Sequence, residues 1–299
     1  MLNFLPEIEK GNVRSLARCI SLLENQGEGS FEVLKNLPPN IKPVIGFTGP
    51  PGVGKSTLVN GLIGALLKQQ KKIAVVCIDP SSPFHQGAFL GDRIRMNEWA
   101  GNPGVYIRSL SSRGSLGGLH PRIFEITDLL KAAPYDYIVI ETVGIGQSEL
   151  EIASIADFTV MILMAGAGDE IQALKSGVLE IADLFVINKS DHAGTKQFKN
   201  DLQYALHLGS RKIDIIETIA TENRGTEELL QSIEKGLNSL VQKKPTNLAE
   251  KAFRLILAGK MREINKSVLL EIIKEESKSE NFNIYKFVED FLNTRNESV

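Results

Sequence analysis

The chain has 299 residues, with 34 basic and 36 acidic side chains and a formal net charge of −2. This near-balance argues against a broad polycationic surface for nucleic acid, and the 42% hydrophobic content is typical of a globular protein with a substantial core. The sequence contains no run of about 18 apolar residues, the length that a membrane span needs. Its first residues do not have the residue pattern of a secretory signal or a transit peptide. We therefore expect a cytoplasmic protein that has neither nucleic acid nor a membrane as a partner.

Residues 1–40 predict a helical extension, because apolar residues between Ile8 and Leu23 recur at helical spacing. Residues 41–240 alternate short apolar runs with helical stretches, which predicts an α/β domain. Runs that are apolar throughout are typical of a mostly parallel sheet with helices on both faces. Residues 241–299 begin polar and then resume helical periodicity, so we expect a helical arm there. The seven expected strands lie at 44–48, 73–78, 105–108, 137–141, 159–163, 184–188 and 213–217.

A glycine-rich segment joins the first expected strand to an expected helix over Thr57–Leu67 and matches the phosphate-loop pattern G-x-x-x-x-G-K-[ST]. Glycines let successive amide groups curl around phosphate oxygens, and the following helix presents the positive end of its dipole. Lys55 is expected to span the β- and γ-phosphates, and the Ser56 hydroxyl to ligate Mg²⁺. The residues predicted to contact the phosphates are Gly49, Pro50, Pro51, Gly52, Val53, Gly54, Lys55, Ser56 and Thr57.

The sixth expected strand ends in Asn188-Lys189-Ser190-Asp191, which resembles the guanine-specificity motif N-K-x-D of GTPases. In that family the aspartate accepts hydrogen bonds from guanine N1–H and the 2-amino group, which adenine does not offer. The motif follows a later strand of the same sheet, at the edge where parallel sheets bind nucleotides. After the last strand, Ile219-Ala220-Thr221 is expected to close over the base, with Ala220 contributing a backbone contact. The predicted ligands are therefore GTP and GDP.

Three carboxylates are candidates for work at the phosphates. Asp79 and Glu141 each close an apolar strand, and Asp92 lies in Gly91-Asp92-Arg93. Glu141 is followed by Thr142-Val143-Gly144, the arrangement of a Walker-B acid with a γ-phosphate-sensing glycine. We expect Ser56, Asp79, Asp92 and Glu141 around Mg²⁺. The predicted catalytic residues are Lys55, Asp92 and Glu141.

Several further segments together resemble the MeaB/ArgK-like GTPases, which are chaperones of adenosylcobalamin-dependent acyl-CoA mutases such as methylmalonyl-CoA mutase. The likeness covers about residues 10 to 230. The segments that carry it are Gly11-Asn12-Val13-Arg14, Asp79-Pro80-Ser81-Ser82-Pro83-Phe84, Gly91-Asp92-Arg93-Ile94-Arg95-Met96, Ile107-Arg108-Ser109-Leu110, Arg113-Gly114-Ser115-Leu116-Gly117-Gly118-Leu119, Glu141-Thr142-Val143-Gly144-Ile145-Gly146-Gln147-Ser148-Glu149 and Gly166-Ala167-Gly168-Asp169-Glu170.

This resemblance implies a seven-stranded parallel P-loop GTPase core, a helical N-terminal extension and a C-terminal arm that forms a homodimer. It also implies three mobile elements: switch I from Pro80 to about Arg113, switch II from Glu141 to Glu149, and switch III from Asp169 to Lys175. In switch III, Asp169 and Lys175 match residues that couple nucleotide state to the mutase. GTP hydrolysis is expected to be slow until a partner organises the switches, and nucleotide state to gate cofactor loading or protection of the mutase.

Two other function classes share this nucleotide core. A nickel-insertion GTPase of hydrogenase or urease maturation needs clustered soft or imidazole ligands, whereas the four histidines here are scattered along the chain and no Cys-x-x-Cys occurs. A small-molecule kinase needs an acceptor pocket and a base, and no motif predicts one. Both remain alternatives at this stage.

Overall fold

All seven strands belong to one sheet, in the order β3-β2-β4-β1-β5-β6-β7, and every pairing is parallel. This confirms the predicted fold class. The chain divides into two compact units, Met1–Asn247 and Leu248–Val299. The computed structural model describes residues 4–39, 42–79, 97–113, 118–142, 144, 151–166, 178–208, 212–239, 252–253, 255–257, 266–276 and 287.

The strands lie within a residue or two of the predicted runs, except at one end. β3 continues three residues past the expected end, because its pairing with β2 persists to Asp79 and Ser111. The strands are β1 (Val44–Thr48), β2 (Ile73–Asp79), β3 (Val105–Ser111), β4 (Tyr137–Glu141), β5 (Phe158–Leu163), β6 (Leu184–Asn188) and β7 (Asp214–Thr218). The helices of the first unit are α1 (Leu5–Glu9), α2 (Val13–Glu24), α3 (Ser30–Lys35), α4 (Lys55–Lys68), α6 (Ile123–Ala132), α9 (Val178–Ile181), α10 (Thr195–Leu208) and α11 (Thr226–Ser239), with 3-10 turns η1 (Asn97–Trp99) and η2 (Ala220–Glu222).

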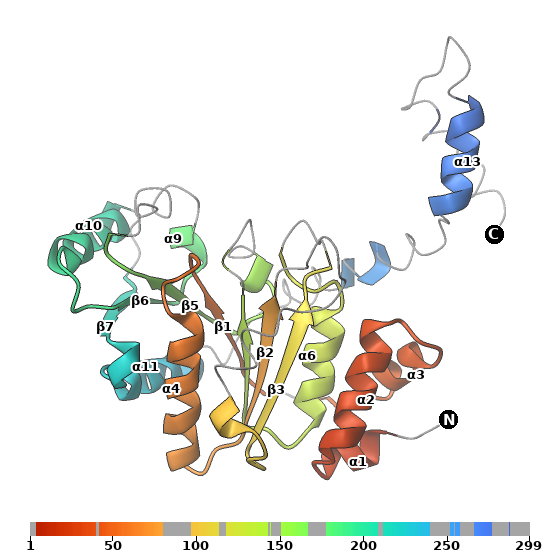
Figure 1. The fold of residues 1–299 in the computed structure, drawn as a ribbon, viewed down its shortest axis with the longest axis horizontal. Coiled ribbons are helices and arrows are strands. Elements are labelled where there is room, and N and C mark those ends of the chain that lie inside the picture. Colours follow the sequence, from red (N-terminus) through yellow and green to blue (C-terminus); the bar gives the residue numbers. More distant parts are fainter. Residues whose placement is uncertain are drawn as a thin grey trace. The chain divides into compact units, whose positions relative to one another are not determined.

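Helices cover both faces of the sheet, as the uniformly apolar strands predict (Figure 1). On one face, α4 and α11 pack over β1 and its neighbours, with Phe47, Leu62 and Ile233 fully buried. On the other face, α6 covers β2 and β4 and α2 packs on α6, while α10 covers β5 and β6. The central strands are thereby fixed from both sides, and their carboxyl ends form one edge that bears the predicted motifs.

The N-terminal extension is fastened to this core. α2 begins at Asn12, whose side chain accepts hydrogen bonds from the amides of Arg14 and Ser15, and its apolar face packs on α6. At its other end, Glu24 pairs with Arg108 of β3. Arg113, just beyond β3, donates to the Glu24 carbonyl at 2.8 Å and to Asn25 Oδ1 at 3.0 Å. Two arginines of the α/β core thus hold the C-terminal end of α2.

The described residues of the second unit are helical, consistent with an arm. They include α13 (Lys266–Glu276) and two short pieces at 252–253 and 255–257. Phe253 and Ile256 are about 60% exposed. Within the described segments, no helix combines the length and the apolar character that crossing a membrane requires.

His120 is a buried histidine beside the arginines that hold α2. Only 1% of it is exposed, and Nδ1 accepts a hydrogen bond from the Arg122 amide at 3.0 Å. Burial, followed by the positive charges of Arg113, Arg122 and Arg108, lowers the pKa of His120 to about 4. The imidazole is therefore neutral in the folded protein at every pH above that value.

Replacing His120 by Asn should make folding stability less sensitive to acid. Between about pH 6.5 and 4 the unfolded chain binds a proton at this histidine that the folded chain does not, so stability falls as the pH falls. The wild type should therefore lose up to about 1.4 kcal/mol more per pH unit than His120→Asn, whose amide oxygen can still accept from the Arg122 amide. Urea unfolding at several pH values measures this difference. The exposed His207→Asn variant is the control. Equal slopes of the free energy of unfolding against pH for His120→Asn and the wild type would contradict the expectation.

Candidate nucleotide-binding site

The predicted phosphate loop connects β1 to α4 at the carboxyl edge of the sheet, where the sequence places it. Gly54 precedes α4 with a φ of +95°, a left-handed conformation that glycine adopts without strain. A Cβ at this position would lie only 2.3 Å from the Asn188 Nδ2 atom. Lys55, 7% exposed, donates from Nζ to the carbonyls of Gly49 and Pro50, at 2.9 Å each. The loop therefore folds around the lysine ammonium group.

Asn188 ties this loop to the predicted base-contacting segments. Its Nδ2 donates to the Val53 carbonyl at 2.7 Å. Its Oδ1 accepts from the Thr218 hydroxyl at 3.0 Å and from the Ala220 amide at 3.1 Å. The side chain is 1% exposed, so these bonds form away from water, where leaving them unmade would be costly. The Asn188 amide thus joins the loops that follow β1, β6 and β7, which are far apart in the sequence.

The next residues of the N-K-x-D segment are hydrogen bonded to the phosphate loop and to the end of β7. Lys189 has a left-handed φ of +56° and donates from Nζ to the Gly52 carbonyl at 2.9 Å. The Ser190 amide donates to the Thr218 carbonyl at 3.0 Å. Asp191 follows with an exposed side chain. A fixed backbone therefore carries a solvent-accessible carboxylate beside the phosphate loop, as recognition of a base requires.

A hydroxyl and a carboxylate meet at the start of α4. Ser56 Oγ donates to Glu141 Oε1 at 2.6 Å, and both residues are buried. Glu141 ends β4, which lies between β1 and β2. Asp79 ends β2 and is 3% exposed. The predicted ligands Ser56, Glu141 and Asp79 therefore come from neighbouring elements at one edge, and the first two are in direct contact.

Gly144 rests on the phosphate loop. Its φ is +77°, and a Cβ there would lie 2.0 Å from the Gly49 carbonyl oxygen and 2.8 Å from Lys55 Nζ. Just before it, the Thr142 hydroxyl hydrogen bonds with that of Thr48 at 2.8 Å, and both threonines are at most 1% exposed. Gly144 therefore contacts the phosphate loop through its backbone, and the Thr142 side chain contacts Thr48, the residue just before the loop.

The structure brings together most of the predicted residues that it describes. Ile219 and Ala220 lie beside Asn188, and the Ala220 amide, predicted to contact the base, donates to Asn188 here. The predicted residues Asp92, Asp169 and Lys175 lie outside the described residues, as do 80–96 of switch I and 143 and 145–149 of switch II. Sequence reasoning missed the buried hydroxyls of Thr48, Thr142 and Thr218. Their position next to a motif at the end of an apolar strand is the pattern that could have indicated them.

Comparison with known proteins agrees with this geometry. A protein-family model described as "Methylmalonyl Co-A mutase-associated GTPase MeaB" matches residues 16–277. The chain belongs to the MeaB family of P-loop GTPases. A putative GTPase of Pyrococcus abyssi is 42% identical to it over 240 residues, which is 77% of this chain and 74% of the relative.

Two further relatives cover nearly the whole chain. The GTPase ArgK of Escherichia coli is 32% identical to this MeaB-family chain over 298 residues, or 95% of the chain and 86% of ArgK. A crystal structure of a LAO/AO transport system kinase aligns with a TM-score of 0.68 at 25% identity, covering 99% of this chain and 92% of that one. The chain is therefore a GTPase of this family and shares the α/β fold of that structure.

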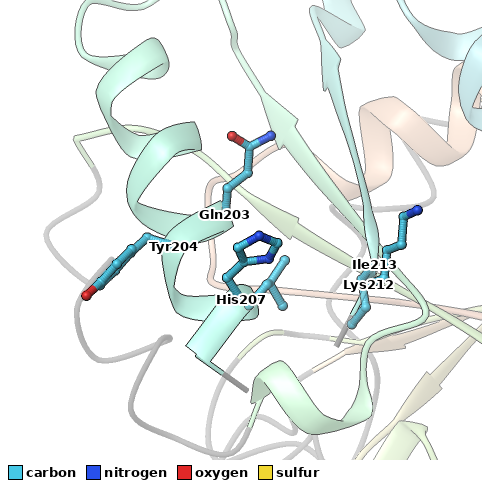
Figure 2. Close-up of a pocket in the computed structure, with 6 residues that line it drawn as sticks. Gln203, Tyr204, His207, Lys212 and Ile213 are labelled. Atoms are coloured by element: carbon cyan, nitrogen blue, oxygen red, sulfur yellow. The ribbon is translucent and has the colours of Figure 1, made fainter. Parts of the chain in front are cut away.

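A pocket elsewhere in this MeaB-family GTPase has a different character. It has a volume of about 430 Å³ and lies between α10 and the residues preceding β7 (Figure 2). Figure 2 shows Tyr204 directed away from His207 and Lys212, so its polar groups do not converge. Lys212 precedes the amino end of β7, whereas the predicted site is at the carboxyl edge. None of the predicted site residues lines this pocket.

Asn188→Ala should destabilise the GTPase by about 3 kcal/mol, because it leaves the Val53 carbonyl, the Thr218 hydroxyl and the Ala220 amide without their buried partner. Urea unfolding without nucleotide measures the loss. Asn102→Ala, which removes one half-buried hydrogen bond to the Gly104 amide, is the matched control and should cost less than about 1 kcal/mol. Equal losses in the two variants would show that Asn188 is not a structural bridge.

Proposed function

We propose that this MeaB-family GTPase is a nucleotide-dependent chaperone that gates cofactor loading or protection of an adenosylcobalamin-dependent acyl-CoA mutase. The family description, which names methylmalonyl-CoA mutase, supports this partner. The observation that carries the proposal is the contact of Gly144 with Gly49 and Lys55. Because the segment after Glu141 touches the phosphate loop, a change at the γ-phosphate is transmitted to it directly.

The phosphate loop supplies the site for the triphosphate. The amides of the loop and the N-terminus of α4 face the anion, and Lys55 moves its ammonium group from loop carbonyls to the β- and γ-phosphates. We assign phosphate contacts to residues 49–57. Asp191 reads guanine N1–H and the 2-amino group, while Asn188 and Lys189 hold the loop that carries Asp191. The backbone of Ile219, Ala220 and Thr221 closes over the base.

The oxygens at the start of α4 fit Mg²⁺. Ser56 Oγ and Glu141 Oε1 are hard oxygen donors 2.6 Å apart, and Mg²⁺ prefers such donors while keeping several waters. One or two carboxylates therefore suffice. In the described segments no three His, Cys, Asp or Glu side chains form a metal-binding group. Ser56 and Glu141 would hold the ion with Asp79 and Asp92 in support, and the ion would neutralise charge on the phosphates.

Hydrolysis follows from in-line attack of water on the γ-phosphate. The attack breaks the bond from the γ-phosphorus to the β–γ bridging oxygen and releases GDP and phosphate. Lys55 stabilises the charge that develops on the phosphate oxygens, while Glu141 and Asp92 would hold the metal ion and orient the attacking water. We expect slow turnover in the isolated protein and faster turnover when a partner orders the switch segments. Asp169 and Lys175 couple nucleotide state to the mutase, and the residues from 241 onward form a homodimer.

Asp191→Asn should exchange guanine preference for xanthine preference. The amide donates where the carboxylate accepts, so it suits the 2-oxo group of xanthine and no longer matches the 2-amino group of guanine. GDP affinity measured by calorimetry should fall about hundredfold. XDP affinity should rise above that of GDP. The exposed Asp201→Asn variant is the control. If Asp191→Asn keeps wild-type selectivity, Asp191 does not read the base.

Capture of a purified adenosylcobalamin-dependent methylmalonyl-CoA mutase should depend on nucleotide state. The immobilised GTPase, loaded with GDP or with a non-hydrolysable GTP analogue, should retain amounts of mutase that differ about tenfold. Gly144→Ala should reduce this difference, because its Cβ would collide with the Gly49 carbonyl. Capture that is absent, or equal in both nucleotide states, would contradict the mutase proposal. It would not contradict the assignment of the chain as a GTPase.

A further inference from the structure

A groove of about 570 Å³ lies between α4 and α11, beside the 219–221 loop. One wall is α4, where Gly61 and Gly64 have no side chains to fill the space. The opposite wall is formed by η2 and the first turn of α11, which includes Thr226. Of the residues that line this groove, Thr57, Ala220 and Thr221 belong to the predicted nucleotide site and the others do not. The chemistry of the groove therefore needs its own explanation.

One corner of the groove contains hydrogen-bond acceptors. Thr226 is 4% exposed, and its Oγ1 has no hydrogen-bond partner among the residues that the structure describes. Asn223 Oδ1 lies next to it. A Cβ on Gly61 would be 2.9 Å from Asn223 Oδ1 and 3.3 Å from Thr226 Oγ1. Because residue 61 is a glycine, these two side-chain oxygens lie directly against the backbone of α4 at the wall of the groove. A buried hydroxyl without a partner at such a place indicates a ligand that donates hydrogen bonds.

The groove also carries negative charge. Glu98, Glu227 and Glu228 line it, and among the described lining residues Lys68, at the far end of α4, is the one cation. Acidic residues in the first turn of α11 also suit the helix dipole, but that does not explain Glu98, which comes from η1. Its carboxylate is held across α4, because Asn60 Nδ2 donates to Glu98 Oε1 at 2.6 Å.

An aromatic ring completes the groove. Trp99 Nε1 donates to Asn60 Oδ1 at 2.5 Å, so the same Asn60 amide orients both the indole and the Glu98 carboxylate. An indole beside a carboxylate, in a groove lined by further carboxylates, is a combination that attracts an organic cation through Coulomb and cation–π interactions. The residues are held in place by hydrogen bonds before any ligand arrives, which reduces the entropic cost of binding.

We propose that this groove binds a lysine side chain from an extended basic segment of a protein partner. An ammonium group has three N–H donors, which match Thr226 Oγ1, Asn223 Oδ1 and a carboxylate of Glu227 or Glu228. From Thr57 to Lys68 the groove wall measures about 16 Å, at 1.5 Å per helical residue. An extended peptide of about five residues has this length. The inference goes beyond the proposed function and does not depend on it.

The test uses Trp99, the only tryptophan in the chain. The full-length protein without nucleotide is titrated with the peptide acetyl-Gly-Gly-Lys-Gly-Gly-amide while tryptophan emission is recorded. The emission should change and saturate. The same peptide with Nε-acetyl-lysine has no charge and should give no saturable change. Equal responses to the two peptides, or no response to either, would overturn the proposal. GDP binding, measured separately, reports on the nucleotide site alone.

Variants test the location. Gly61→Ala fills the acceptor corner while raising helix propensity, and the Asn223 side chain can yield to the new methyl group. It should abolish the emission change with α-helical circular dichroism retained. Glu227→Gln/Glu228→Gln should weaken lysine-peptide binding about fivefold or more. Glu9→Gln/Glu28→Gln changes the net charge equally at exposed acids of the N-terminal extension and should have no effect. Similar weakening in both double variants would overturn the site, because it would show a response to net charge.

Discussion

The site depends on one buried amide. Asn188 reaches from the end of β6 to Val53 in the phosphate loop and to Thr218 and Ala220 after β7. β1 and β6 are not neighbours in the sheet, since β5 lies between them. The loops that follow them therefore need a connection of their own, and Asn188 provides it. The predicted phosphate loop and the predicted base-contacting segments are in this way parts of a single hydrogen-bonded unit.

A second connection joins this unit to the segment after β4. Gly144 lies against the Gly49 carbonyl, and the Thr48 and Thr142 hydroxyls are hydrogen bonded beneath it. Ser56 and Glu141 meet on the same side of the loop. The contacts are close enough that a Cβ at Gly144 has no room, so Gly144 packs directly against the backbone of the phosphate loop. Such close packing is how a small chemical difference becomes a change of conformation.

The fold could be predicted from sequence almost completely, because fully apolar strands separated by helical stretches leave few arrangements other than a parallel sheet. The motifs also predicted where Lys55, Ser56 and Asn188 lie in the fold, since Lys55 and Ser56 begin α4 and Asn188 ends β6. The hydrogen bonds between motifs were not predictable. The position of Thr48 and Thr218 beside a motif could have indicated that they matter, but their hydrogen-bond partners depend on which strands lie side by side. The acceptor corner at Gly61 likewise depends on how α11 packs against α4.

The attachment of the N-terminal helices has a practical consequence for protein production. α2 covers apolar residues of α6, and Arg108 and Arg113 are bonded to its last turn. A shortened chain that starts at β1 would uncover this apolar surface and separate Arg108 from Glu24. Such a fragment would tend to aggregate during expression. Purification tags and truncations are therefore better placed before α1 than between α3 and β1.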